Sequence, residues 1–384
     1  VTNRSLSLRP PSFPYRLDIT GGTVRFDGSQ VIIESINARH DASTLSAHGS
    51  CVRNSDGRWE LLLNLHSGSR LHPDAELIAA TPTLMREAMR RLQLRGPINL
   101  RGQTRLLMSD EQHPEPAIDW NLVLQLEGNR IADVGPVHSL RGEISVAGAS
   151  DDRGVRASGE VRIDSMHCHD LQLTGIRGPF AINGDRLKLG GGPIERIGRS
   201  TVANLDQVDS QHSIQGRVFD GTLRVDGEVI LSRASFDVDL ALSDAQLTTV
   251  LADFGHSDSD LTGTLSAKTQ LQGKLGTTEL LTGGGAARVR GANLYQLPLI
   301  VQVLNQLRIT PTEDVAFTDG EFEYTVFGDT MTFSEMQIWG DLVALDGGGT
   351  LDRRHELDLT FNTRVSPQNT FTKVIRPLKS QKYT

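Results

Sequence analysis

The stretch GEISVAG, Gly142–Gly148, carries the pattern that decides the fold. Glycine stands at each end of this phrase, and apolar residues occupy its third and fifth positions. The phrase recurs along the chain, and its last copy is two residues longer. The other copies are GTVRFDG (Gly22–Gly28), GPINLRG (Gly96–Gly102), GPFAING (Gly178–Gly184), GTLRVDG (Gly221–Gly227), GAARVRG (Gly285–Gly291) and GEFEYTVFG (Gly320–Gly328). Such repetition indicates a protein built from repeats.

The phrase has the period of a β-strand. Side chains alternate across a strand, so Ile144 and Val146 share one face while Glu143 and Ser145 share the other. Each phrase therefore predicts a half-buried strand, with glycines that supply turns, bulges or close backbone approach at the strand ends. We expect one apolar face to continue through the copies. Its candidate residues are Val24, Phe26, Ile144, Val146, Leu223, Val225, Phe322 and Tyr324.

Further alternating runs lie between these phrases. Turn signals such as Asn54–Gly57 and Asp151–Gly154 separate neighbouring runs. Short turns between adjacent strands favour antiparallel meanders. The sequence thus predicts a mainly β, elongated scaffold. The additional runs are ELLLNLH (Glu60–His66), DWNLVLQLEG (Asp119–Gly128), SFDVDLALS (Ser235–Ser243) and HELDLTFNT (His355–Thr363).

Three short stretches have helical spacing instead, at residues 82–94, 245–254 and 298–307. We expect them to cover parts of the sheet and not to form a helical domain. The predicted organisation is a repetitive β segment over residues 1–190, with the first helix, and a C-terminal β segment over residues 191–384, with the other two. One continuous structure is the alternative.

Composition argues against nucleic acid as a partner. Aromatic residues make up only 5% of the chain, which leaves few platforms on which bases stack. The formal net charge is −8, whereas phosphate binding requires a concentrated basic surface. The longest apolar stretch, Leu297–Leu304, is far shorter than the ~20 residues of a membrane-spanning helix. We expect any anchor to lie outside this sequence, which resembles an excised part of a longer protein.

The sequence contains no recognisable catalytic motif, and we expect a protein that is not an enzyme and needs no cofactor or metal. The densest polar cluster is His167-Cys168-His169-Asp170. In an extended strand His167 and His169 point to one side and Cys168 to the other, whereas structural zinc needs four ligands. Exposed strand residues are therefore favoured over a metal site. The second cysteine is Cys51, and the sequence leaves open whether the two pair.

The stretch from Leu261 to about Val365 resembles the C-terminal region of the AsmA-like family of bacterial envelope proteins. A glycine-punctuated strand, LTGTLSAKTQLQGK (Leu261–Lys274), comes first. A run ending in a short apolar helix follows at Glu279–Leu307, then the strands of Phe317–Asp352 and LDLTFNTRV at Leu357–Val365. The order of these elements carries the resemblance. One departure is Ala286-Ala287, where a bulkier apolar residue is expected.

The resemblance implies a long, curled antiparallel sheet with an apolar groove. It also implies the periplasmic part of an inner-membrane-anchored protein that carries phospholipid towards the outer membrane or supports outer-membrane assembly. Partners would be an acyl-chain lipid and envelope proteins of either membrane. A structural or adhesive scaffold and a protein-binding module remain open, because a closed β-sandwich also needs one apolar face per strand. Further groove candidates are Leu299, Ile300, Val303, Leu304, Leu357, Leu359 and Phe361.

Overall fold

The computed structural model describes most of the chain in two compact units. The N-terminal unit comprises Val1–Gly191 together with Glu228–Ala234, and the C-terminal unit comprises Gly192–Gly227 together with Ser235–Thr384. Each unit is described by itself. The described residues are 6–9, 15–81, 86, 89–90, 93–111, 116–131, 137–168, 171–191, 213–253, 261–292, 317–340, 343–352, 356–365 and 372–373.

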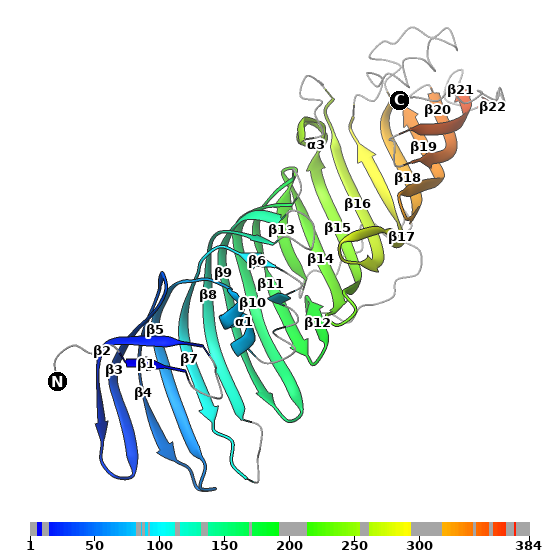
Figure 1. Cartoon of the computed structure of the whole chain (residues 1–384). Helices are drawn as coiled ribbons and strands as arrows, with labels where there is room; N and C mark the ends of the chain where they lie inside the picture. Colours follow the sequence, from blue (N-terminus) through cyan, green and yellow to red (C-terminus); the bar gives the residue numbers. More distant parts are fainter. Residues whose placement is uncertain are drawn as a thin grey trace. The chain divides into compact units, whose positions relative to one another are not determined.

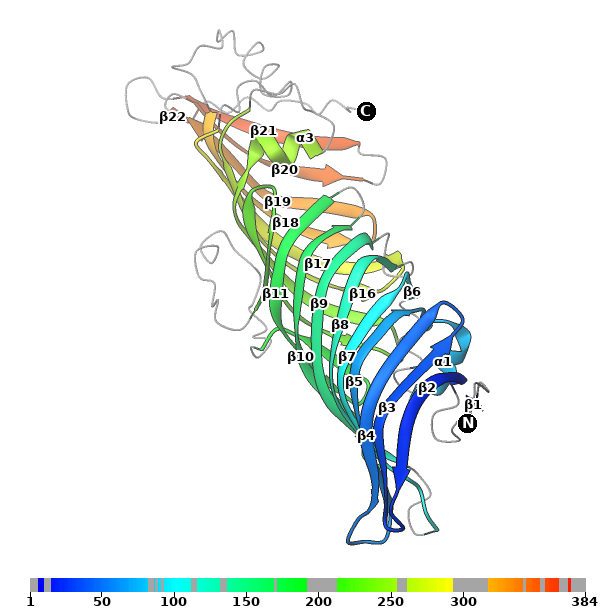
Figure 2. The same ribbon diagram turned by 90° about the vertical axis from the view of Figure 1, so that its left-hand side faces the viewer.

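The N-terminal unit is a single antiparallel layer in which strands β2 to β12 pair almost entirely in chain order (Figures 1 and 2). Short β1 pairs with β2, and two-residue β6 pairs with β8. The elements are β1 (Leu6–Leu8), β2 (Leu17–Phe26), β3 (Gln30–His40), β4 (Ser43–Arg53), β5 (Trp59–Leu71), α1 (Ala75–Ala80), β6 (Leu94–Arg95), β7 (Ile98–Leu107), β8 (Ala117–Ile131), β9 (Val137–Asp151), β10 (Gly154–Cys168), β11 (Leu171–Asn183) and β12 (Arg186–Leu189).

The C-terminal unit is also antiparallel. Strand β13 pairs with β14, and β15 to β22 pair in chain order, with α3 following directly on β15 (Figure 1). The elements are β13 (Ile214–Val218), β14 (Gly221–Ile230, of which Glu228–Ile230 belong to the N-terminal unit), β15 (Ser235–Gln246), α3 (Leu247–Asp253), β16 (Thr264–Lys274), β17 (Thr277–Arg290), β18 (Phe317–Phe327), β19 (Thr330–Gly340), β20 (Val343–Leu351), β21 (Leu357–Val365) and β22 (Thr372–Lys373).

The mainly β, antiparallel fold class is confirmed, but the helices differ from the prediction. Among the described residues α1 and α3 are the helical elements with assigned bounds. Helix α1 is unpredicted, and Asp74 caps it by accepting the Leu77 N–H at 2.7 Å. Helix α3 begins two residues later than predicted, because β15 continues through a register shift at Leu242/Ala245. Arg86, Met89 and Arg90 of the predicted 82–94 helix are helical, and the 298–307 helix lies outside the described residues.

Eight of the fourteen glycines that bound the phrase lie inside strands and six lie at or just beyond strand ends, so the prediction that they mark strand ends holds for only some of them. The phrase Gly142–Gly148 sits in the middle of fifteen-residue β9. Gly142 has φ +148°, and a Cβ there would lie 2.3 Å from the Arg162 carbonyl oxygen of β10. Only glycine fits such a conformation beside a neighbouring backbone. The phrase therefore marks places where strands bend or approach closely, within strands longer than the phrase itself.

Three clusters of buried apolar residues form the cores. In the N-terminal unit, one cluster contains Ile98, Leu126, Leu140 and Ile163, and a second contains Trp120, Val155 and Ala157. In the C-terminal unit, Leu247 of α3 packs with the apolar ends of the neighbouring strands. The other buried members of that cluster are Leu261, Val289, Ala292, Phe317, Met336, Ile338, Val343, Leu345 and Phe361.

Candidate functional site

One face of the N-terminal unit is apolar across ten neighbouring strands. Side chains directly opposite each other on paired antiparallel strands point to the same side of the sheet, so the registers define rows of residues that share a face. We call the face formed by the row through Val24 and the row next to it the N-terminal apolar face. The first row is Val24, Ile33, Gly49, Leu63, Thr104, Trp120, Gly148, Ala157, Ile182 and Leu187. The second is Gly22, Ile36, Ala47, Leu65, Gly102, Leu122, Val146, Gly159, Phe180 and Leu189.

The C-terminal unit has an equivalent face, which we call the C-terminal apolar face. Its rows cross β15 to β21 and contain one polar pair, in which the Thr269 and Tyr324 hydroxyls hydrogen-bond to each other. Burial raises the pKa of Tyr324. One row is Leu240, Thr269, Gly285, Tyr324, Phe333, Gly349 and Leu359, and the next is Leu242, Ala267, Ala287, Phe322, Met336, Gly347 and Phe361.

The predicted face residues of the N-terminal unit differ in exposure. Val24 and Phe26, on outer strand β2, are 55% and 66% exposed. Ile144 and Val146, near the middle of the sheet, are half-buried and pack against the two core clusters. All four side chains share one face by register. The N-terminal apolar face is therefore most exposed to solvent at β2.

The predicted residues of the C-terminal unit include one core residue. Phe361 is only 3% exposed and belongs to the buried cluster, which corrects its assignment as an open lining position. Phe322 and Leu359 are half-buried and pack against that cluster. Leu223 and Val225 of β14 are half-buried and lie opposite Gly216 and Ile214 of β13. The remaining candidates, Leu299, Ile300, Val303 and Leu304, and the side chain of Leu357, lie outside the described residues.

Aromatic rings on these faces lie over glycines of the adjacent strand, a feature the sequence interpretation missed. A Cβ on Gly148 would lie 2.7 Å from Cζ2 of Trp120, and one on Gly159 would lie 2.8 Å from the ring of Phe180. Gly285 stands in the same relation to Tyr324, and Gly347 to Phe361. Each glycine lies directly opposite its aromatic partner. The ring covers the bare backbone of the glycine, which compensates for its missing side chain.

The opposite face of the N-terminal sheet is polar. Arg105 binds Glu60 through two bonds of 2.8 and 2.9 Å, and this pairing lowers the pKa of Glu60. Arg101 pairs with Glu143 at 2.9 Å from strands that are not adjacent. The sheet thus separates an ion-paired surface from an apolar one, as expected when one face meets water.

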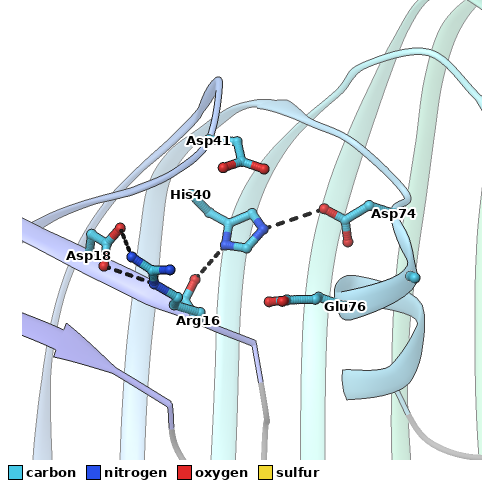
Figure 3. A pocket seen from close by; sticks show the side chains of 7 residues that line it. Arg16, Asp18, His40, Asp41, Asp74 and Glu76 are labelled. Atoms are coloured by element: carbon cyan, nitrogen blue, oxygen red, sulfur yellow. Dashed lines mark hydrogen bonds and ion pairs between the residues drawn. The ribbon is translucent and has the colours of Figure 1, made fainter.

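A polar pocket lies where β2, β3 and the start of α1 meet (Figure 3). His40 reaches across it. Its Nδ1 donates to the Arg16 carbonyl oxygen at 2.7 Å, and its Nε2 lies 3.4 Å from an Asp74 carboxylate oxygen. Because Asp74 also caps α1, the histidine ties the helix to the sheet.

The lining of this pocket is largely acidic. Asp41, Glu76 and Asp74 face His40, while Arg16 pairs with Asp18 at 3.1 Å (Figure 3). The Ser7 hydroxyl and Arg16 lower the pKa of Asp18. Tyr15 packs against His40 with ring centroids 4.2 Å apart, and burial together with Asp74 raises the pKa of Tyr15 to about 12. The pocket is thus a polar junction between helix and sheet.

Only His167 and Cys168 of the polar cluster noted in the sequence lie within the described residues. His167 lies directly opposite His138 of β9, with ring centroids 5.0 Å apart and planes inclined by 8°, while His169 and Asp170 lie outside the described residues. Within the described ranges, no three His, Cys, Asp or Glu side chains form a group able to hold a metal ion. Cys51 and Cys168 are both free thiols, and burial raises the pKa of each.

No described helix is long and apolar enough to cross a bilayer. Comparisons with protein-family models, curated proteins and solved structures find no match to this chain. The resemblance carried by Leu261–Val365 therefore stays a prediction. The two apolar faces are the structural features that bear on function.

Proposed function

We propose that this chain is a lipid-handling segment of a bacterial envelope protein, in which the apolar faces carry the acyl chains of phospholipid between the inner and outer membranes or in support of outer-membrane assembly. The observation that carries the proposal is the pair of apolar rows across ten strands of the N-terminal unit, in which Thr104 is the one polar residue. Val24 and Phe26 are both exposed, so their apolar side chains contribute little to a core, whereas they would contact a bound acyl chain.

The energetics favour a sliding mechanism. An acyl chain that leaves a bilayer exposes apolar surface at about 0.8 kcal/mol per CH₂. A continuous aliphatic surface removes most of that cost at every position without creating one tight site. Thr104 is the single polar residue in the two N-terminal rows defined above, so little along them would hold a head group in place. Such a surface suits transport better than storage.

Two features of this chain would favour the curled shape that a groove requires. Bulges bend a strand and increase its twist, and register shifts occur between β2 and β3, β3 and β4, and β4 and β5. Glycines within strands allow sharp bends, and Gly22, Gly102 and Gly142 have φ of +148°, +135° and +148°. These features favour a curved sheet, and we propose that the apolar face lies on its concave side.

We propose a periplasmic location for this segment, with phospholipid and envelope proteins as partners. The second candidate is a structural or protein-binding scaffold. The observation that favours it is the burial of Phe361 and its neighbours, since that part of the C-terminal apolar face is closed core.

Neighbouring residues on opposite faces provide the test. Leu122 and Val146 lie opposite each other on the apolar face, while Asn121 and Ala147 lie opposite each other on the polar face and are exposed. A photoreactive amino acid is placed at each position of the full chain, which is mixed with vesicles of labelled phosphatidylethanolamine and phosphatidylglycerol and irradiated.

The proposal predicts lipid adducts at Leu122 and Val146 and few at Asn121 and Ala147. Equal labelling of both faces, or none on either, would overturn it. Protein adducts confined to Leu122 and Val146 in cells, without lipid adducts, would instead support the scaffold.

A further inference from the structure

Two histidines converge on the polar face of the N-terminal unit, away from the apolar rows. His48 of β4 lies directly opposite Asn64 of β5, and Ala47 lies opposite Leu65 on the apolar face. Because side chains alternate, His48 and His66 both project from the polar side. His66 sits at a register shift between the pairs Ala47/Leu65 and Ser46/Ser67, which makes it the diagonal neighbour of His48. Bulges of this kind re-aim side chains.

The two imidazole rings meet through their nitrogens. Nδ1 of His48 lies 2.6 Å from Nε2 of His66, whereas the ring centroids are 4.4 Å apart and the planes are inclined by 21°. The two planes are close to parallel, so the rings are stacked with an offset that brings these two nitrogens together. One nitrogen must carry a proton and the other must accept it. The two ring nitrogens therefore lie close enough to contact one ion together.

We propose that His48 and His66 bind a divalent transition-metal ion, of the class of Cu²⁺ or Zn²⁺, in place of the proton between them. Imidazole nitrogen suits these ions, whereas Mg²⁺ and Ca²⁺ prefer oxygen. Metal–nitrogen bonds of about 2.0–2.1 Å require the two nitrogens to separate by a few tenths of an ångström. Solvent-accessible side chains make that adjustment readily, and water fills the remaining coordination positions.

The surroundings leave the pair accessible. His66 is exposed and His48 half-exposed, so an ion and its waters reach both rings from solvent. The nearest acidic residue along β3, Glu34, is engaged by Arg25 of β2. Arg101 on β7 is directed away, to Glu143 of β9. The site is thus a two-nitrogen chelate that joins β4 to β5.

The test uses the full chain without an affinity tag, in metal-free buffer at near-neutral pH. Cu²⁺ alone is titrated by calorimetry into the wild-type chain, His48→Gln, His66→Gln and the control His138→Gln, which alters the other cross-strand histidine pair. Loss of either chelating ring should weaken the tightest binding roughly 100-fold, because the second ligand no longer acts intramolecularly. His138→Gln should leave that binding unchanged.

Three results would overturn the proposal: no tight equivalent of Cu²⁺ in the wild-type chain, full binding in either single variant, or an equal loss in His138→Gln. Circular dichroism without metal checks that the variants fold. Should one of them misfold, electron paramagnetic resonance of the wild-type chain with ¹⁵N-labelled histidine counts the bound imidazoles directly. Two coupled nitrogens are expected, and one or none would refute the site.

Discussion

The indole ring of Trp120 on β8 occupies the space directly above the backbone of Gly148 on β9. The two residues are opposite each other in the register, and a Cβ on Gly148 would lie 2.7 Å from Cζ2 of the ring. Trp120 is itself buried within a core cluster. The absence of a side chain at Gly148 is therefore what makes room for the Trp120 ring at this place on the apolar face.

Gly148→Ala should destabilise the N-terminal unit by about 1–3 kcal/mol, the usual cost of overpacking a filled core. The added methyl group would also lie 2.5 Å from the Arg156 carbonyl oxygen, so a shift of the ring alone gives no relief. Urea denaturation followed by tryptophan fluorescence measures the change. The matched control is Gly21→Ala, where a Cβ meets nothing within 4 Å and which should stay within about 0.5 kcal/mol of wild type. Equal effects of the two changes would contradict this account.

The glycine–aromatic pairs show where sequence reasoning stops. Alternation correctly places Val146 on the apolar face and Glu143 on the polar face. This assignment needs only the sequence of one strand, because side chains alternate with a period of two. The partner of a glycine depends on which strand lies next to it and in what register, and bulges change that register. At Gly142 and Gly148 the seven-residue phrase therefore suggests strand ends where the structure has the interior of β9. Helix α1 was missed because six residues are too few to show a helical period.

Phe361 illustrates a second limit, since alternation assigns a face but not a depth. Its ring is buried against Gly347 in the core of the C-terminal unit. Phe361→Ala should therefore cost about 3–5 kcal/mol, as expected for a buried phenylalanine. Thermal melting of the variant measures this loss. The control is Phe327→Ala, because the Phe327 side chain is 76% exposed. If the two variants lower the melting temperature equally, Phe361 is a lining residue and not a core residue.

Tyr15 should make stability fall at high pH. Its pKa is raised to about 12 in the folded chain, from an ordinary value near 10.0. The folded state therefore holds the phenolic proton more tightly than the unfolded state. The contribution of protonated Tyr15 to the free energy of unfolding is fully present below about pH 10 and is lost as the pH rises towards 12.

The measurement is the melting temperature of the wild-type chain and of Tyr15→Phe between pH 9 and about 12. Phenylalanine keeps the packing against His40 but has no proton to lose. The difference in melting temperature between the two proteins should be constant up to about pH 10 and change steadily from there towards pH 12. Parallel curves up to pH 12 would mean that burial of Tyr15 does not perturb its ionisation.

Phe26 offers the sharpest separation of lipid handling from folding. It shares a face with Val24 at the outer strand and is 66% exposed, so a charge there is solvated and should change the melting temperature little. On the apolar face, however, the same charge would have to be desolvated by a passing acyl chain, at a cost far above the gain from any one CH₂ group. Phe26→Lys should therefore lower the transfer of fluorescent phospholipid between vesicles several-fold while the protein stays folded. The control Ala147→Lys adds the same charge on the exposed polar face and should leave transfer unchanged. If both variants transfer lipid at the wild-type rate, the exposed end of the apolar face is not part of a lipid path.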